Sequence, residues 1–219
     1  MAKTIFLSPS NQKSNIGTGD YGSEARRMNE IANIMEIELE RSGIIVEREG
    51  DEVCIDDRVR YANSIGANAY ISLHSNSRPD ESCEPQMGTE IYVCPERFES
   101  DKLARCIYAN MKNVKGFIGR GLRKSAAYKE VNSPRMPSCM VEVDFHDNHE
   151  RACWIVESMY DIAVNISKGI LSYFNMPYKE KEVRKYYRIQ LGAFTSKEKA
   201  EQMARALQND GYPTVIKYY

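Results

Sequence analysis

Short apolar runs alternate with segments of helical periodicity from residue 3 to residue 175, and this alternation restricts the possible folds more than any other feature of the chain. The first run, TIFLS at residues 4–8, is rich in β-branched and aromatic residues and stops at Ser-Pro, which predicts a buried strand entering a loop. The next segment has apolar residues at helical spacing, namely Met28, Ile31, Ala32, Met35 and Leu39. Strands that alternate with helices favour an α/β fold with a mainly parallel central sheet flanked by helices.

The alternation continues along the chain. Further strands are expected at residues 44–49, 69–75, 88–94 and 137–145, and further helices at residues 57–64, 100–113 and 151–174. In open sheets of this kind, ligands bind outside the carboxyl ends of the strands. We therefore expect residues 8–12, His74 and residues 142–146 to lie at one edge of the sheet.

The composition excludes several classes of protein. With 219 residues, a net charge of −1 and 42% hydrophobic residues, the chain is neither a disordered protein nor basic enough to indicate nucleic-acid binding. The first twelve residues hold only a short apolar run, which predicts synthesis in the cytoplasm without a signal peptide and no membrane insertion. The six cysteines show no CxxC spacing, so we expect them to be reduced and mostly buried.

Three residues that are far apart in the sequence meet at the expected sheet edge. Glu24 lies in the first turn of a helix, His74 ends one strand, and Glu142 ends an apolar run in another. A single histidine near an apolar strand is more often a satisfied core group, so the interpretation rests on the combination. Carboxylate oxygen and imidazole nitrogen are zinc ligands, and a further carboxylate can act as general base for a zinc-bound water.

These residues also carry a family resemblance. The segments GSEARRMNEIA, EVCIDDRVRYAN, AYISLHSN, GTEIYV, LARCIY, GRGL and MPSCMVEVDFHDN follow one another in the order and spacing of a known family. Over residues 1 to about 175 the chain resembles the zinc-dependent N-acetylmuramoyl-L-alanine amidases of the Amidase_3 type. The resemblance implies an enzyme that cleaves the amide bond between N-acetylmuramic acid and the L-alanine of the stem peptide in peptidoglycan. It also implies that Glu24 and His74 bind zinc and that Glu142 is the catalytic glutamate.

The chain departs from the family after the first strand. Where the family usually reads D-P-G-H-G-G, with the histidine a zinc ligand, this chain reads SPSNQ and has Asn11 at the matching position. Only His146 and His149 remain as further histidines, and we hypothesise that His146 supplies the third zinc ligand. The alternatives are a side-chain oxygen of Asn11 or Gln12, a site with two ligands, or a metal-free site. His146 has the plainer alternatives of capping the next helix or contacting substrate, and His149 is expected to be a solvated residue at the helix start.

Two residues, Glu142 and Arg58, can also be interpreted as partners in structural ion pairs. Glu142 has the alternative role of pairing with Arg120 or Arg135. Arg58 is expected to pair with a nearby carboxylate and to hold its helix against the sheet.

The last part of the chain has its own pattern. We expect a catalytic domain at residues 1–176, a charged linker at 177–185, and a strand, helix and strand at 186–219 that are too short to hold a core alone. The segment beginning YYRIQLGAF resembles the first half of the SPOR peptidoglycan-binding domain, whose hallmark is V/I-Q-x-G-A/S-F. Either the sequence is truncated, or two half-domains pair in a homodimer through residues 184–219.

The resemblance leaves three functions to separate. The main expectation is a zinc amidase that acts on the cell wall after release by a holin or by lysis, like the phage endolysins and mother-cell lysis amidases that it resembles. One alternative is a catalytically inactive peptidoglycan-binding module that lacks a full zinc site. Another is a zinc hydrolase that acts on a different amide, such as a free peptide.

Overall fold

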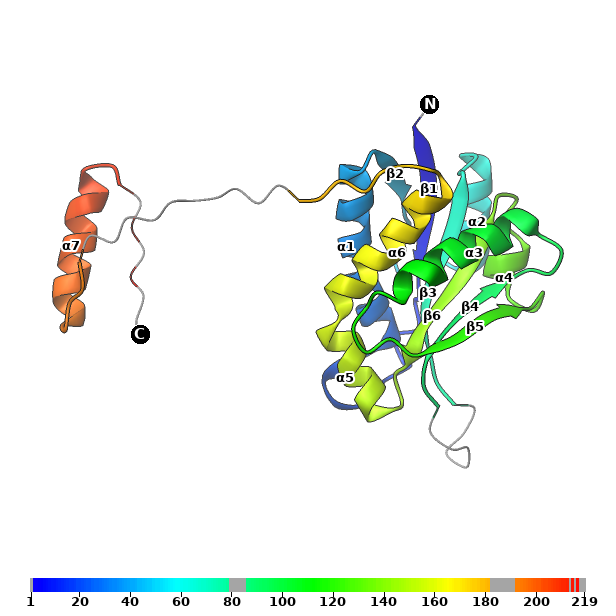
Figure 1. The fold of residues 1–219 in the computed structure, drawn as a ribbon, viewed down its shortest axis with the longest axis horizontal. Helices are drawn as coiled ribbons and strands as arrows, with labels where there is room; N and C mark the ends of the chain where they lie inside the picture. The colour runs from blue at the N-terminus through cyan, green and yellow to red at the C-terminus, as the bar shows by residue number, and fades with distance from the viewer. Residues whose placement is uncertain (1, 79–85, 182–191, 213, 215, 217–219) are drawn as a thin grey trace. The chain divides into compact units, whose positions relative to one another are not determined.

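The computed structural model describes residues 2–78, 86–181, 192–212, 214 and 216 (Figure 1). They form two compact units, residues 1–180 and 181–219. The first unit contains a six-stranded sheet with the order β2-β1-β3-β6-β4-β5. Its strands are β1 (Lys3–Pro9), β2 (Ile44–Glu47), β3 (Ala69–Asn76), β4 (Thr89–Val93), β5 (Gly119–Lys124) and β6 (Ser138–Phe145). All neighbours pair in parallel except β4 and β6, which confirms the mainly parallel α/β fold.

Helices cover both faces of this sheet (Figure 1). The first unit contains η1 (Gly19–Tyr21), α1 (Glu24–Arg41), α2 (Ile55–Ser64), α3 (Phe98–Met111), α4 (Lys129–Asn132), α5 (His149–Glu157) and α6 (Met159–Tyr173). Apolar side chains of α1, α3 and α6 build the main core on one face, and α2 packs on a smaller core on the other face. Ile5 and Leu7 belong to the main core, whereas Phe6 between them stacks on Tyr70 in the smaller one. Successive side chains of a strand point to opposite faces, so the continuous apolar run of β1 serves both cores.

The capping residue of α1 fixes the position of one candidate site residue. The Ser23 side chain accepts a hydrogen bond from the backbone N–H of Arg26, as an N-cap residue does. Glu24 is therefore the first residue of the helix, and its carboxylate is held beside the end of β1 rather than further along the helix. A negative charge in the first turn also interacts favourably with the helix dipole.

The structure differs from the sequence-based expectation in three places. The helix expected at residues 151–174 is two helices, α5 and α6, which are separated at Ser158. The backbone N–H of Ser158 closes the last turn of α5 on the Trp154 carbonyl. Strand β5 and helix α4 were not expected, since GRGLRK has no apolar run and α4 has only four residues. Of the five described cysteines, all are free but only Cys139 is buried.

The second unit is described only in part. Its helix α7 (Lys197–Asn209) begins at Ser196, which accepts a hydrogen bond from the backbone N–H of Lys199, and no residue of the helix is buried. The strands expected at residues 186–194 and 212–219 fall mostly outside the described residues. Across the described residues, no helix combines the length and the apolar character needed to cross a membrane.

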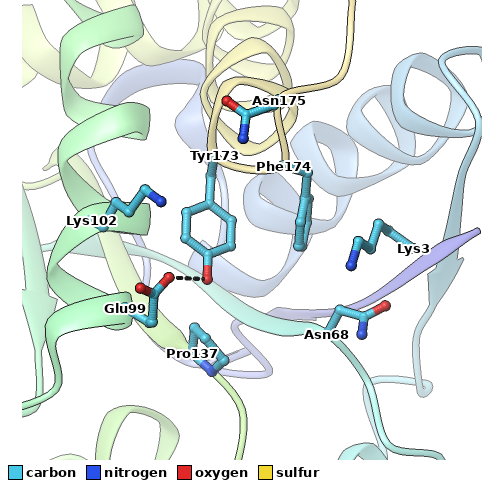
Figure 2. A pocket seen from close by; sticks show the side chains of 8 residues that line it. All are labelled: Lys3, Asn68, Glu99, Lys102, Pro137, Tyr173, Phe174 and Asn175. Atoms are coloured by element: carbon cyan, nitrogen blue, oxygen red, sulfur yellow. Dashed lines mark hydrogen bonds between the residues drawn. The ribbon is translucent and has the colours of Figure 1, made fainter.

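A pocket of about 360 Å³ opens at the amino ends of the strands (Figure 2). It is lined by Lys3 of β1, by Asn68 and Pro137 just before β3 and β6, and by α3 and the end of α6. The Tyr173 hydroxyl donates a hydrogen bond to Glu99 Oε2 at 2.9 Å, which is the dashed line in Figure 2. The pocket lies at the sheet edge opposite to His74, so it is separate from the candidate site.

Arg58 is buried and anchors α2 to the sheet, as expected, although its acceptors differ from the expected carboxylate. Its guanidinium donates to the carbonyls of Pro9 at 2.6 Å and Gly50 at 3.0 Å, and it lies 3.3 Å from the hydroxyl oxygen of Ser8. A guanidinium offers five N–H groups, so one side chain satisfies acceptors at the end of β1 and in the loop before α2.

We expect Arg58→Ala to lower the free energy of unfolding by about 2–4 kcal/mol, because it removes a buried guanidinium and leaves the buried Pro9 carbonyl without this donor. The control is Arg60→Ala on the same helix, which removes only an exposed ion pair to Asp57 and is expected to cost at most about 0.5 kcal/mol. Urea denaturation of both variants measures the difference, and equal losses would contradict the anchoring role.

Candidate active site at the carboxyl ends of β3 and β6

The three residues expected at the sheet edge lie together. β3 and β6 are parallel neighbours, and their register sets His74 directly opposite Glu142. Glu24 at the start of α1 reaches the same point, with its Oε1 2.9 Å from His74 Nδ1. Parallel strands end at one edge, so residues separated by more than a hundred positions become neighbours.

His74 is held between two carboxylates. Its Nδ1 contacts Glu24 Oε1 at 2.9 Å, and its Nε2 contacts Glu130 Oε2 at 2.8 Å. Burial alone would lower the pKa of His74, but the hydrogen bonds to Glu130 and Glu24 raise the pKa well above its ordinary value. The ring therefore carries a positive charge that offsets the two buried carboxylates.

Glu24 is enclosed by hydrogen-bond donors. Burial raises the pKa of its carboxyl, but the hydrogen bonds that it accepts from His74 and others outweigh this effect, and the pKa lies below its ordinary value. Asn15 Nδ2 donates to Glu24 Oε2 at 2.6 Å, and the Ser75 backbone N–H donates to Oε1 at 3.4 Å. Glu24 is therefore ionised at neutral pH, as a metal ligand must be.

Glu142 is the one carboxylate of this group whose Oε2 is buried without any hydrogen-bond partner. Burial raises its pKa to about 7; the positive charge of His74 opposes the shift, and the carboxylates of Glu24, Glu90 and Glu130 add to it. A carboxyl group that titrates near neutral pH exchanges protons readily under the conditions in which most enzymes work.

Of the two arginines expected as alternative partners of Glu142, Arg120 pairs elsewhere and Arg135 is exposed in the loop before β6. The Arg120 Nε donates to Oε1 of Glu90, and the Arg123 Nε lies 3.4 Å from Oε2 of the same carboxylate. Glu90 is opposite Glu142 in the antiparallel pair of β4 and β6. Arg120 and Arg123 therefore pair with Glu90, and the Oε2 atom of the neighbouring Glu142 is buried without a hydrogen-bond partner.

His146 is buried near Glu24 without contacting it. Its Nδ1 lies 2.8 Å from the Ser75 hydroxyl oxygen, its Nε2 lies 3.1 Å from Asn15 Oδ1, and its ring stacks on Tyr21 at a centroid distance of 5.2 Å. Burial lowers the pKa of His146, so the ring is neutral. Its alternative role as a helix cap does not apply, because Asn148 caps α5.

The described residues meet the requirements of a zinc site in part. Glu24 Oε1 and His74 Nδ1 are adjacent donors of the types that zinc prefers. Among the residues that the structure describes, no group of three or more His, Cys, Asp or Glu side chains is arranged to hold a metal ion. Asn11 is half-buried and Gln12 is exposed, while Asn15 separates His146 from Glu24. The third-ligand hypothesis for His146 stays a prediction.

Two residues of the site have no signal in the sequence. Glu130 lies on the four-residue helix α4, which has no periodicity. Asn15 lies in the irregular loop after β1, three positions beyond the residues that were considered there. Their side chains contact the functional residues only because the fold brings distant loops together, and a single sequence contains no record of such contacts.

Comparison with known proteins defines the class. Residues 5–172 match the model of the N-acetylmuramoyl-L-alanine amidase family Amidase_3, and residues 183–219 match the SPOR domain. The chain belongs to this amidase family, and its last segment is SPOR-like. The family assignment supports peptidoglycan amidase activity, and enzymes of the family are generally zinc-dependent.

Individual relatives agree with this assignment. The chain is 25% identical to the N-acetylmuramoyl-L-alanine amidase CwlM of Bacillus licheniformis, over 98% of this chain and 84% of the relative. It is 23% identical to the sporulation-specific N-acetylmuramoyl-L-alanine amidase of Bacillus subtilis (strain 168), over 97% of this chain and 83% of the relative. The catalytic domain of the amidase CwlV from Bacillus (Paenibacillus) polymyxa shares the fold, with a TM-score of 0.70 and 21% identity over 80% of this chain and 99% of that domain.

The raised pKa of Glu142 predicts a pH-dependent stability of the metal-free protein. The folded-state pKa of about 7 lies above the unfolded value, so ionisation of Glu142 destabilises the fold, and the penalty grows as the pH rises from about 4.5 to 7. With a chelator present, Glu142→Gln should be more stable than the wild type by about 1–3 kcal/mol at pH 8, and this advantage should shrink toward zero near pH 4.5.

Urea denaturation across this pH range measures the effect, and Glu150→Gln on the exposed surface of α5 is the control. A Glu142→Gln variant with the same advantage at every pH would contradict the shifted titration.

Proposed function

We propose that this chain is a zinc-dependent hydrolase that cleaves the amide bond between N-acetylmuramic acid and the L-alanine of the peptidoglycan stem peptide, with Glu142 as general base. The observation that carries the proposal is the position of Glu142. It is a carboxyl group with an unpartnered buried oxygen and a pKa of about 7, opposite His74 in the strand register. Membership of the amidase family supplies the substrate class.

Glu24 and His74 are the residues that would hold the metal, since their donor atoms adjoin at the strand ends. When bound, zinc supplies polarisation of the amide carbonyl and activation of a water molecule. The network around the two ligands fixes their direction. Asn15 and the Ser75 backbone orient the Glu24 carboxylate, and Glu24 and Glu130 orient the His74 ring.

Glu142 moves the proton. The attacking water forms a bond to the amide carbon while Glu142 takes its proton, and the carbon–nitrogen bond then breaks as Glu142 returns that proton to the departing alanine nitrogen. A pKa near neutrality allows the same carboxyl group to accept and then donate. The absence of a hydrogen-bond partner at Oε2 keeps this oxygen available for the proton.

We expect Glu142→Ala to abolish hydrolysis, with a loss of at least about 100-fold, while the protein stays folded. The measurement is the release of new L-alanine amino termini from purified cell walls, together with an assay for reducing sugars, which should stay negative. Glu150→Ala is the matched control on the surface of α5. Retained hydrolysis in Glu142→Ala refutes the general-base role, and cleavage of free peptides in preference to cell walls favours the alternative substrate.

The third zinc ligand is tested by elemental analysis. If His146 is that ligand, the wild type should contain about one zinc per chain and His146→Ala should lose it. The control is His149→Ala, which removes an exposed histidine three positions further on and should keep the metal. Zinc that stays bound in His146→Ala excludes this ligand. A wild type that takes up no zinc after reloading favours the inactive peptidoglycan-binding module.

The SPOR-like segment is proposed to target the cell wall and to pair with a second copy of the chain through residues 184–219. The pairing is supported by helix α7, which has no buried residue, and by the exposed side chains of Met203 and Tyr212. Light scattering of the full chain should give twice the mass of one chain. A monomer at all accessible concentrations contradicts the pairing.

A further inference from the structure

Glu130 is a buried carboxylate that has no part in the proposed proton transfer. It lies on α4, is 3% exposed, and has both oxygens engaged. Oε1 accepts hydrogen bonds from the hydroxyls of Ser8 at 2.6 Å and Tyr70 at 2.9 Å, while Oε2 contacts His74 Nε2 at 2.8 Å. The carboxylate therefore joins β1 and β3 at the point where the site begins.

A purely structural role explains this arrangement poorly. An ionised carboxylate is costly to bury, and well-packed apolar residues fill such a position at least as well. The surroundings stabilise the negative charge, because the hydroxyls of Ser8 and Tyr70 both donate to Oε1 of Glu130. The other oxygen, Oε2, faces the His74 imidazole. The direction of the carboxylate is thus fixed by residues that do not touch the proposed metal site.

The contacts of His74 compete with each other. Glu24 accepts at Nδ1, and this contact alone would hold the neutral ring in the tautomer with its proton on Nδ1. In that tautomer Nδ1 has no lone pair for a metal. Glu130 is the opposing acceptor at Nε2, the far side of the same ring.

We propose that Glu130 is a positioning residue, which keeps the proton of His74 on Nε2 and so leaves Nδ1 for the metal that Glu24 and His74 bind. The inference rests on the proposed zinc site. Histidine ligands of metals generally donate their other ring N–H to such an acceptor, and loss of the acceptor typically weakens metal binding 10–100-fold.

The test is zinc affinity, measured on the full chain by competition with a chromogenic chelator. Glu130→Leu should bind zinc about 10–100-fold more weakly than the wild type. Glu130→Gln retains an amide oxygen that can accept from Nε2–H and should recover part of the loss. Tyr70→Phe removes a hydroxyl that holds Glu130 but leaves the contact with His74, so its affinity should stay within about threefold of the wild type.

Nitrogen NMR of the three histidines gives a readout that a packing defect would not change. In the metal-free Glu130→Leu variant, at a pH where the ring is neutral, His74 should carry its proton on Nδ1. In the zinc-loaded wild type it should carry the proton on Nε2.

Normal zinc binding by the wild type with unchanged affinity and an unchanged tautomer in Glu130→Leu would overturn the role of Glu130 alone. An equal loss of affinity in Tyr70→Phe, with the His74 tautomer unchanged in Glu130→Leu, would also overturn it. A wild type that binds no zinc would refute the proposed zinc site, and the role of Glu130 in metal binding with it.

Discussion

His74 placed between two buried carboxylates is the interaction on which the site depends. One positive ring offsets the charges of Glu24 and Glu130, and each of those carboxylates has further donors from the protein. The net charge of Glu24, Glu130 and the His74 ring is already negative. Ionisation of a third carboxylate, that of Glu142, beside them is therefore disfavoured. Burial is the largest cause of the raised pKa of Glu142. The positive charge of His74 lowers this pKa, but the neighbouring carboxylates oppose that effect, so the pKa stays raised. At this edge of the sheet, Glu24 and Glu130 therefore stay ionised at neutral pH, whereas Glu142 exchanges a proton there.

The sheet supplies this arrangement through its two cores. Because β1 and β3 are parallel neighbours buried on both faces, apolar packing fixes their positions, and their carboxyl ends lie at one edge of the sheet. The antiparallel strand β4 contributes differently. It brings Glu90 opposite Glu142, and Glu90 pairs with the arginines of β5, so that their positive charge is not paired with Glu142. A carboxylate paired directly with arginine would have a lowered pKa and would be a weaker base.

The sequence predicts the parts that depend on repeating patterns. Five of the six strands and the long helices follow from apolar periodicity, and the meeting of Glu24, His74 and Glu142 follows from the parallel sheet. The remaining elements depend on tertiary contacts that leave no repeating pattern in the sequence. Strand β5 has a single apolar residue, Leu122, among glycines and charged residues. Helix α4 is a single turn, and the break at Ser158 lies in an unbroken apolar pattern. Glu130 was missed for this reason, since a lone glutamate in a polar loop is identical in pattern to a solvated one.

The loop after β1 places Asn15 between Glu24 and His146. Because the Glu24 carboxylate only accepts hydrogen bonds, the Asn15 amide must direct its Nδ2 group at Glu24 and its Oδ1 at His146. His146 then donates from Nε2, and its Nδ1 accepts from the Ser75 hydroxyl. The Nε2 atom of His146 therefore has no free lone pair while Asn15 lies between the two residues. Metal binding through Nε2 of His146 requires this nitrogen to lose its proton and its contact with Asn15 Oδ1, so this contact and a metal ion exclude each other at Nε2.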